Sequence, residues 1–176
     1  MTVIFGQRST FATEYSLADN HRGAWMFGYA RYWCGGREIG NFSEQTSLRD
    51  LLFMLEGMRR DVGRRQNPRF WNMSATDLFR LVDGGLFGNP DIAPLTLAAD
   101  EQWARHNITP AVDVFDGWKV FIVENSSKAR VVFSEHPFTS IESVAMSAGE
   151  VDSIFEATRI ALGEIYEREV ASAKAP

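Results

Sequence analysis

Three histidines and one cysteine are the side chains in this sequence that most often serve catalysis or metal binding. His21, His106 and His136 are far apart along the chain and stand near turn-like sequence, so we expect them to be solvated loop residues. Cys34 is a lone cysteine, which predicts a small buried hydrophobic side chain. The sequence contains no His-Glu-x-x-His, Cys-x-x-Cys or Asp-rich calcium loop. We therefore predict that the protein is not an enzyme and holds no metal or cofactor.

Two short motifs allow other interpretations. Gly84-Gly85 and Gly88 resemble a phosphate loop, but they follow a predicted helix and have no lysine near them, which favours a helix end. The basic segment 59–69 adjoins Phe70 and Trp71, and guanidinium and aromatic groups together can bind single-stranded nucleic acid. The segment is short and the whole chain is acidic, so a nucleic-acid adaptor stays an alternative. A small hydrolase or transferase with a dispersed active site is the other alternative.

Charge is distributed unevenly along the chain. The formal net charge is −5, with 11 basic and 9 acidic residues in positions 1–88 but 7 basic and 14 acidic residues in positions 89–176. An acidic half suits a basic partner, because complementary potentials accelerate encounter. The candidate partner-binding residues are acidic and belong to this half: Asp113, Asp116, Glu124, Asp152, Glu156, Glu164 and Glu167.

Strands are predicted in the N-terminal third and in the centre of the chain. Aromatic-rich runs at residues 11–17 and 24–33 alternate in polarity, and Gly35-Gly36 predicts a hairpin turn into a strand at residues 37–42. Asp116-Gly117 predicts a hairpin within residues 112–133, which we interpret as a three-strand meander. A further strand is expected at residues 140–146.

Helices are expected between and after these strands. Ser47 and Ser74 are predicted N-caps, with Asp50 and Asp77 three residues later, and the second helix is expected to end at Gly84-Gly85. Ser147 and a capping box open a final helix of about 24 residues. The predicted fold class is α+β, with antiparallel sheets from the N-terminal hairpins and the central meander packed against two or three helices.

The length and the terminal sequence suggest how the chain is organised. A chain of 176 residues without linkers or repeats predicts one domain over residues 1–176. The N-terminus lacks the pattern of a signal peptide, and no run approaches the roughly 20 apolar residues that a membrane helix needs. We expect a cytoplasmic protein that does not enter a membrane.

The N-terminal third resembles the Immunity protein 42 family. The resemblance rests on motifs in roughly the first 60 residues: FG at 5–6, FATEY at 11–15, WMFGYARYW at 25–33, IGNF at 39–42 and TSLRDLL at 46–52. The resemblance implies a non-enzymatic bacterial inhibitor that binds the C-terminal domain of a cognate toxin, delivered between cells and encoded beside it. Many such toxins are nucleases with basic clefts, which the acidic half would suit.

Two surfaces could bind such a toxin. The first combines the acidic side of the final helix with the tips of the predicted meander, and it carries the seven acidic candidates given above. The second is the aromatic strand, through Trp25, Tyr29 or Trp33. For these aromatic residues we favour a position in the core, because alternating large rings are typical of a half-buried sheet.

Overall fold

The computed structural model describes residues 2–88 and 101–173, and its N-terminal part is an antiparallel sheet. Its strands run in the order β1-β2-β3-β4, with β5 also paired to β3. The strands are β1 (Thr2–Gly6), β2 (Phe11–Leu17), β3 (Phe27–Cys34), β4 (Arg37–Ile39) and β5 (Thr46–Ser47). The predicted hairpins are therefore confirmed. The strand expected from residue 24 begins later, because Gly23–Trp25 forms a short 3-10 helix.

Alternation along β3 decides which side chains enter the core. Ala30 and Tyr32 are buried, whereas Tyr29 and Arg31 are only half-buried on the opposite face. The turn after β3 uses Gly35 and Gly36, which have φ angles of 60° and 85°. Two consecutive positive φ angles are what a tight two-residue hairpin requires, and glycine adopts them without steric cost.

A second antiparallel sheet has the order β6-β7-β8. Its strands are β6 (Trp118–Glu124), β7 (Lys128–Glu135) and β8 (Glu142–Ser147). The three-strand meander exists, but its first predicted strand was wrong. Asp113–Phe115 is a 3-10 turn in which Phe115 donates its N–H to the Val112 carbonyl. Val114 and Phe115 are both buried in this turn, and the third strand of the sheet is β8.

The helices are α1 (Leu48–Met58), α2 (Pro68–Trp71), α3 (Ala75–Phe87) and α4 (Glu150–Ala173). The predicted caps of α1 and α3 are confirmed, since Ser47 Oγ and Ser74 Oγ accept the N–H groups of Asp50 and Asp77 at 3.2 and 3.1 Å. At the predicted capping box of the final helix, Glu150 Oε2 accepts the N–H of Ser147 at 3.1 Å, but α4 begins only at Glu150, so Ser147 is not its cap. No helix within residues 2–88 and 101–173 is long and apolar enough to cross a membrane.

The end of α3 differs from the prediction. The helix continues through Gly84 and Gly85 to Phe87, and Gly88 ends it in the left-handed conformation with φ of 74°. A Cβ atom on Gly85 would lie 2.2 Å from the indole ring of Trp103. Gly85 therefore serves the close packing of a neighbouring segment, and the phosphate-loop interpretation has no support in its position.

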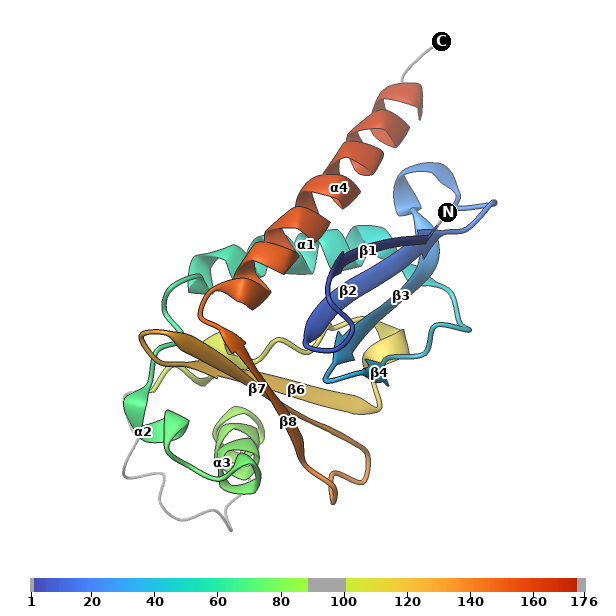
Figure 1. The fold of residues 1–176 in the computed structure, drawn as a ribbon. Coiled ribbons are helices and arrows are strands. Elements are labelled where there is room, and N and C mark those ends of the chain that lie inside the picture. Colours follow the sequence, from blue (N-terminus) through green and yellow to red (C-terminus); the bar gives the residue numbers. More distant parts are fainter. Residues whose placement is uncertain (1, 89–100, 174–176) are drawn as a thin grey trace.

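The second sheet is covered on both faces, as Figure 1 shows. On one face, Val120, Ile122 and Val131 join a core that includes the first sheet, α1 and α4. On the other face, Phe121 and Val132 pack against α2 and α3. The first sheet, by contrast, is covered by helices on its inner face, and its outer face carries the exposed Ile4 and the half-buried Tyr29 and Arg31 beside the buried Glu14 and Trp33. The α+β fold is confirmed, with four α-helices in the part of the chain that the structure describes.

Candidate partner-binding surface

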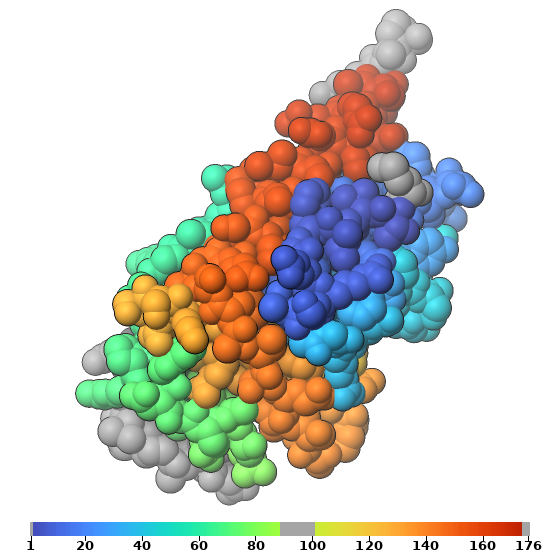
Figure 2. Space-filling view, viewed as in Figure 1, coloured from blue at the N-terminus to red at the C-terminus, as the bar shows by residue number. Residues whose placement is uncertain are grey.

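Helix α4 forms a ridge across the molecule, with the first sheet along one side and α1 along the other (Figure 2). Two of the predicted acidic residues, Glu164 and Glu167, are exposed on this ridge. Glu156 is half-buried and accepts a hydrogen bond from Arg159 at 2.8 Å, with Arg59 at 3.5 Å. The hydrogen bond from Arg159 and its charge hold the pKa of Glu156 below its ordinary value. The exposed candidate carboxylates of the ridge are therefore Glu164 and Glu167, with the exposed Arg168 beside them.

Two other acidic candidates lie inside the protein. Asp152 is 9% exposed and forms an ion pair with Arg65, and Glu124 is 3% exposed. Glu124 Oε1 accepts the N–H of Gly149 at 2.8 Å, just before α4 begins. Both carboxylates face the junction of β6 and α4, so they do not belong to the exposed acidic side of the helix as we had expected.

Asp113 and Asp116 are exposed, but they lie before the start of β6, whereas α4 begins near its end. Seven strand residues separate these two places, which is about 20 Å of extended chain. Asp113 also accepts hydrogen bonds from Thr46 Oγ1 at 2.6 Å and from the Val114 N–H at 2.9 Å. The structure therefore divides the predicted acidic surface into two separate patches.

The α1 and α4 helices together present exposed apolar side chains. Phe53 on α1, Val62 in the segment after α1 and Ile160 on α4 are 47%, 53% and 46% exposed. The Phe53 ring lies edge-on to the ring of Tyr166 at 5.5 Å, and Arg159 approaches Glu56 at 3.8 Å. We call this surface, with residues Phe53, Val62, Glu156, Ile160, Glu164 and Glu167, the α1–α4 face.

Arg65 is the largest fully buried side chain among the described residues. Its guanidinium pairs with Asp152, and its Nε donates to the carbonyl of Arg105 at 3.0 Å. Sequence reasoning had treated Arg65 as part of a basic surface segment. Nothing in the local sequence separates it from Arg64 beside it, which is exposed.

His106 is also buried, which corrects our expectation of a solvated loop residue. Its Nδ1 lies 2.8 Å from the carbonyl oxygen of Ile122, so Nδ1 carries the proton and donates it. Burial lowers the pKa of His106, and the positive charge of Arg105 adds to this, although the Ile122 carbonyl and Glu101 oppose it. His106 therefore joins the loop before β6 to the sheet. His136 is exposed, as expected.

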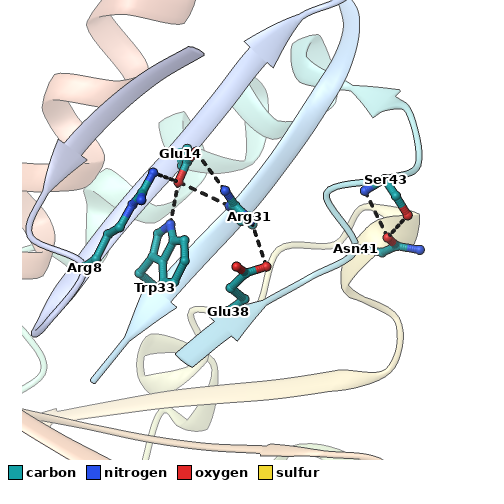
Figure 3. Close-up of polar contacts among 7 residues, drawn as sticks. All are labelled: Arg8, Glu14, Arg31, Trp33, Glu38, Asn41 and Ser43. Atoms are coloured by element: carbon teal, nitrogen blue, oxygen red, sulfur yellow. Dashed lines mark hydrogen bonds and ion pairs between the residues drawn. The ribbon is translucent and has the colours of Figure 1, made fainter. Parts of the chain in front are cut away.

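The outer face of the first sheet holds a network of arginine, glutamate and tryptophan (Figure 3). Glu14 is 3% exposed and accepts hydrogen bonds from Arg8 at 3.1 Å, from Arg31 at 2.9 and 3.2 Å, and from the indole N–H of Trp33. The guanidiniums of Arg8 and Arg31 each lie 4.7 Å from the Trp33 ring centroid. Burial alone would raise the pKa of Glu14, but the hydrogen bonds from Arg31 and Trp33 lower it overall.

This network fixes most of the aromatic strand within the protein. Trp33 is buried as expected, and Tyr29 is half-buried. Trp25 was expected in the core but is 51% exposed, because it lies in the 3-10 helix before β3 and stacks under the guanidinium of Arg49 at 3.8 Å. Trp25 is therefore the aromatic side chain of this second surface that is open to a partner.

The structure also bears on the cysteine, on possible metal ligands and on the basic and aromatic segment that the sequence analysis considered. Cys34 is fully buried, as predicted, and burial raises the pKa of its thiol well above the ordinary value. Within residues 2–88 and 101–173, no group of three histidine, cysteine or acidic side chains could hold a metal ion. Phe70 and Arg65 are buried, so these two side chains of the basic and aromatic segment are not available to a nucleic acid.

Comparison with known proteins agrees with the resemblance seen in the sequence. The model of the Immunity protein 42 family matches residues 1–159, which extends the resemblance well beyond the first 60 residues. The fold is similar to that in the crystal structure of CdiI from Burkholderia dolosa AUO158, with a TM-score of 0.69 and 17% sequence identity, over 90% of this chain and 99% of that chain. No curated protein sequence matches the chain.

Proposed function

This chain belongs to the Immunity protein 42 family, and we propose that it protects its cell by binding a cognate toxin domain and covering the toxin's active site. The family match over residues 1–159 is the observation that carries the proposal. Inhibition of this kind needs no reacting group in the inhibitor. An interface that buries about 800 Å² on each partner is sufficient to exclude a substrate from a catalytic cleft.

The α1–α4 face is the surface that best suits this role. It combines exposed apolar side chains, which supply the desolvated centre of an interface, with the exposed carboxylates of Glu164 and Glu167 at its edge. Its free negative charge favours a basic toxin. A nuclease has a basic substrate cleft, so we propose that the toxin is a nuclease. We also propose that the protein binds this toxin in the cytoplasm, where the nucleic-acid substrate lies.

Co-expression tests the function directly. The toxin should be the C-terminal domain of a large protein encoded beside this chain, and cells that make this domain should survive only when they also make the chain. An unrelated toxin domain serves as the control. Survival without the chain, or death in its presence despite normal expression, would contradict the proposal.

Charge reversal tests the surface. Glu164→Lys with Glu167→Lys should lower the association rate with the toxin about tenfold at low salt, with a smaller effect at high salt because exposed charges are screened. Asp113→Lys with Asp116→Lys is the matched variant at the other acidic patch and should change the rate less. A larger effect from the second variant would show that the contact lies at that patch.

A further inference from the structure

A cavity of about 920 Å³ opens between the C-terminal end of α1, the segment that follows it, and the first turns of α4. Leu55, Met58 and Val62 line one side, and Phe155, Ala157 and Ile160 line the other. These side chains make the walls largely apolar. The lining also includes Arg59 and Glu156, which form an ion pair at 3.5 Å between the segment after α1 and helix α4.

The cavity is also lined by two buried carboxylates, Glu124 at the end of β6 and Asp152 on α4. Asp152 uses Oδ1 for its ion pair with Arg65, while its Oδ2 is buried and has no hydrogen-bond partner among the described residues. Glu124 uses Oε1 for the N–H of Gly149. A buried carboxylate oxygen without a donor costs free energy, so a donor from outside the chain that reached Asp152 Oδ2 through the cavity would lower this cost.

The chemistry of the lining defines what could enter. A ligand that fits this cavity would have an apolar stem that contacts the walls and a positively charged group that donates hydrogen bonds to the carboxylates. Among the described residues, Arg65 and Arg59 do not fill this role, because Arg65 is already bound to Asp152 and to the Arg105 carbonyl, and Arg59 is 59% exposed and paired with Glu156. Lysine and arginine side chains have such a stem with a charged end.

We propose that this cavity receives a lysine or arginine side chain of the bound toxin, which acts as an anchor of the complex. The inference rests on the proposed function and deepens it, because the cavity adjoins Val62 and Ile160 of the α1–α4 face. A basic residue that contacts nucleic acid in the free toxin would then be buried in the inhibitor. One buried anchor of this kind commonly supplies a large share of the affinity of an interface.

A small probe tests the cavity without the toxin. Titration of the protein with n-hexylammonium should produce saturable NMR shifts at the methyl groups of Met58, Val62 and Ile160, and n-hexanoate should produce much weaker ones. Glu124→Gln keeps an oxygen that can accept the Gly149 N–H and removes the charge, so it should weaken n-hexylammonium binding at least about fivefold. Equal binding of the cation and the anion, or no effect of Glu124→Gln, would overturn the proposal.

Filling the cavity tests its use by the toxin. Ala157→Phe should lower toxin affinity at least about tenfold, while Ala171→Phe, at an exposed position of the same helix and outside the cavity, should leave it unchanged. Thermal melting of both variants checks that they remain folded. If the wild-type chain binds the toxin and the Ala157→Phe variant binds it equally well, the proposal of a basic anchor in the cavity is wrong, while the proposed binding of a toxin is retained. If the wild-type chain binds no toxin while n-hexylammonium binds, the proposed function fails.

Discussion

Replacing Arg65 should destabilise the fold far more than replacing an exposed arginine. Arg65→Met removes the partner of Asp152 and leaves a carboxylate that is 9% exposed without its counter-charge. Breaking a buried ion pair on one side costs about 3–5 kcal/mol, since the remaining charge stays desolvated. For a domain of this size, each kcal/mol shifts the melting temperature by about 2–4 °C, so we expect a decrease of roughly 6–20 °C.

The matched control is Arg37→Met. Arg37 pairs with Glu135 and Glu142, but its side chain is 43% exposed, so its loss should cost less than about 1 kcal/mol. Arg65→Met with Asp152→Leu replaces both charges by apolar groups and should recover most of the loss, because no buried charge remains. Urea denaturation measures all of these free energies of unfolding. An effect of Arg65→Met that equals that of Arg37→Met, or simple additivity in the double variant, would refute the reasoning.

Three further predictions concern the interior. Gly85→Ala should destabilise the protein by about 1–3 kcal/mol in urea denaturation, because the added Cβ would overlap the Trp103 ring. Gly57 has open space around it, so Gly57→Ala should instead stabilise α1 by about 0.5–1 kcal/mol. Cys34 should resist iodoacetamide at neutral pH in the native state and react once urea unfolds the chain; rapid native labelling would contradict its burial. Folding lowers the pKa of His106, so the stability that this residue contributes is complete above about pH 6.5 and is lost as the pH falls toward its folded-state pKa. His106→Gln should therefore flatten the dependence of the free energy of unfolding on pH in this range. An unchanged pH dependence in the variant would refute the prediction.

Local patterns predicted the elements that depend on local interactions. Ser47 and Ser74 cap their helices because a cap needs only a side chain and the N–H group three residues later. Gly35-Gly36 forms the hairpin turn because its φ angles are a property of those two residues. One local signal was misleading: Asp116-Gly117 was interpreted as a hairpin turn between two strands, but residues 113–115 before it form a 3-10 turn that buries Val114 and Phe115.

The sequence by itself determined the α+β class, the starts of α1 and α3 and the family, since these depend on periodicity, caps and short motifs. Only the tertiary structure decided which charges are available to a partner. Asp152 and Glu164 both belong to α4, yet one is buried against Arg65 and the other is exposed. The difference arises because a helix turns each residue toward a different neighbour, and the partner of Asp152 is Arg65, which lies 87 residues earlier in the chain. Local sequence carries no record of such contacts.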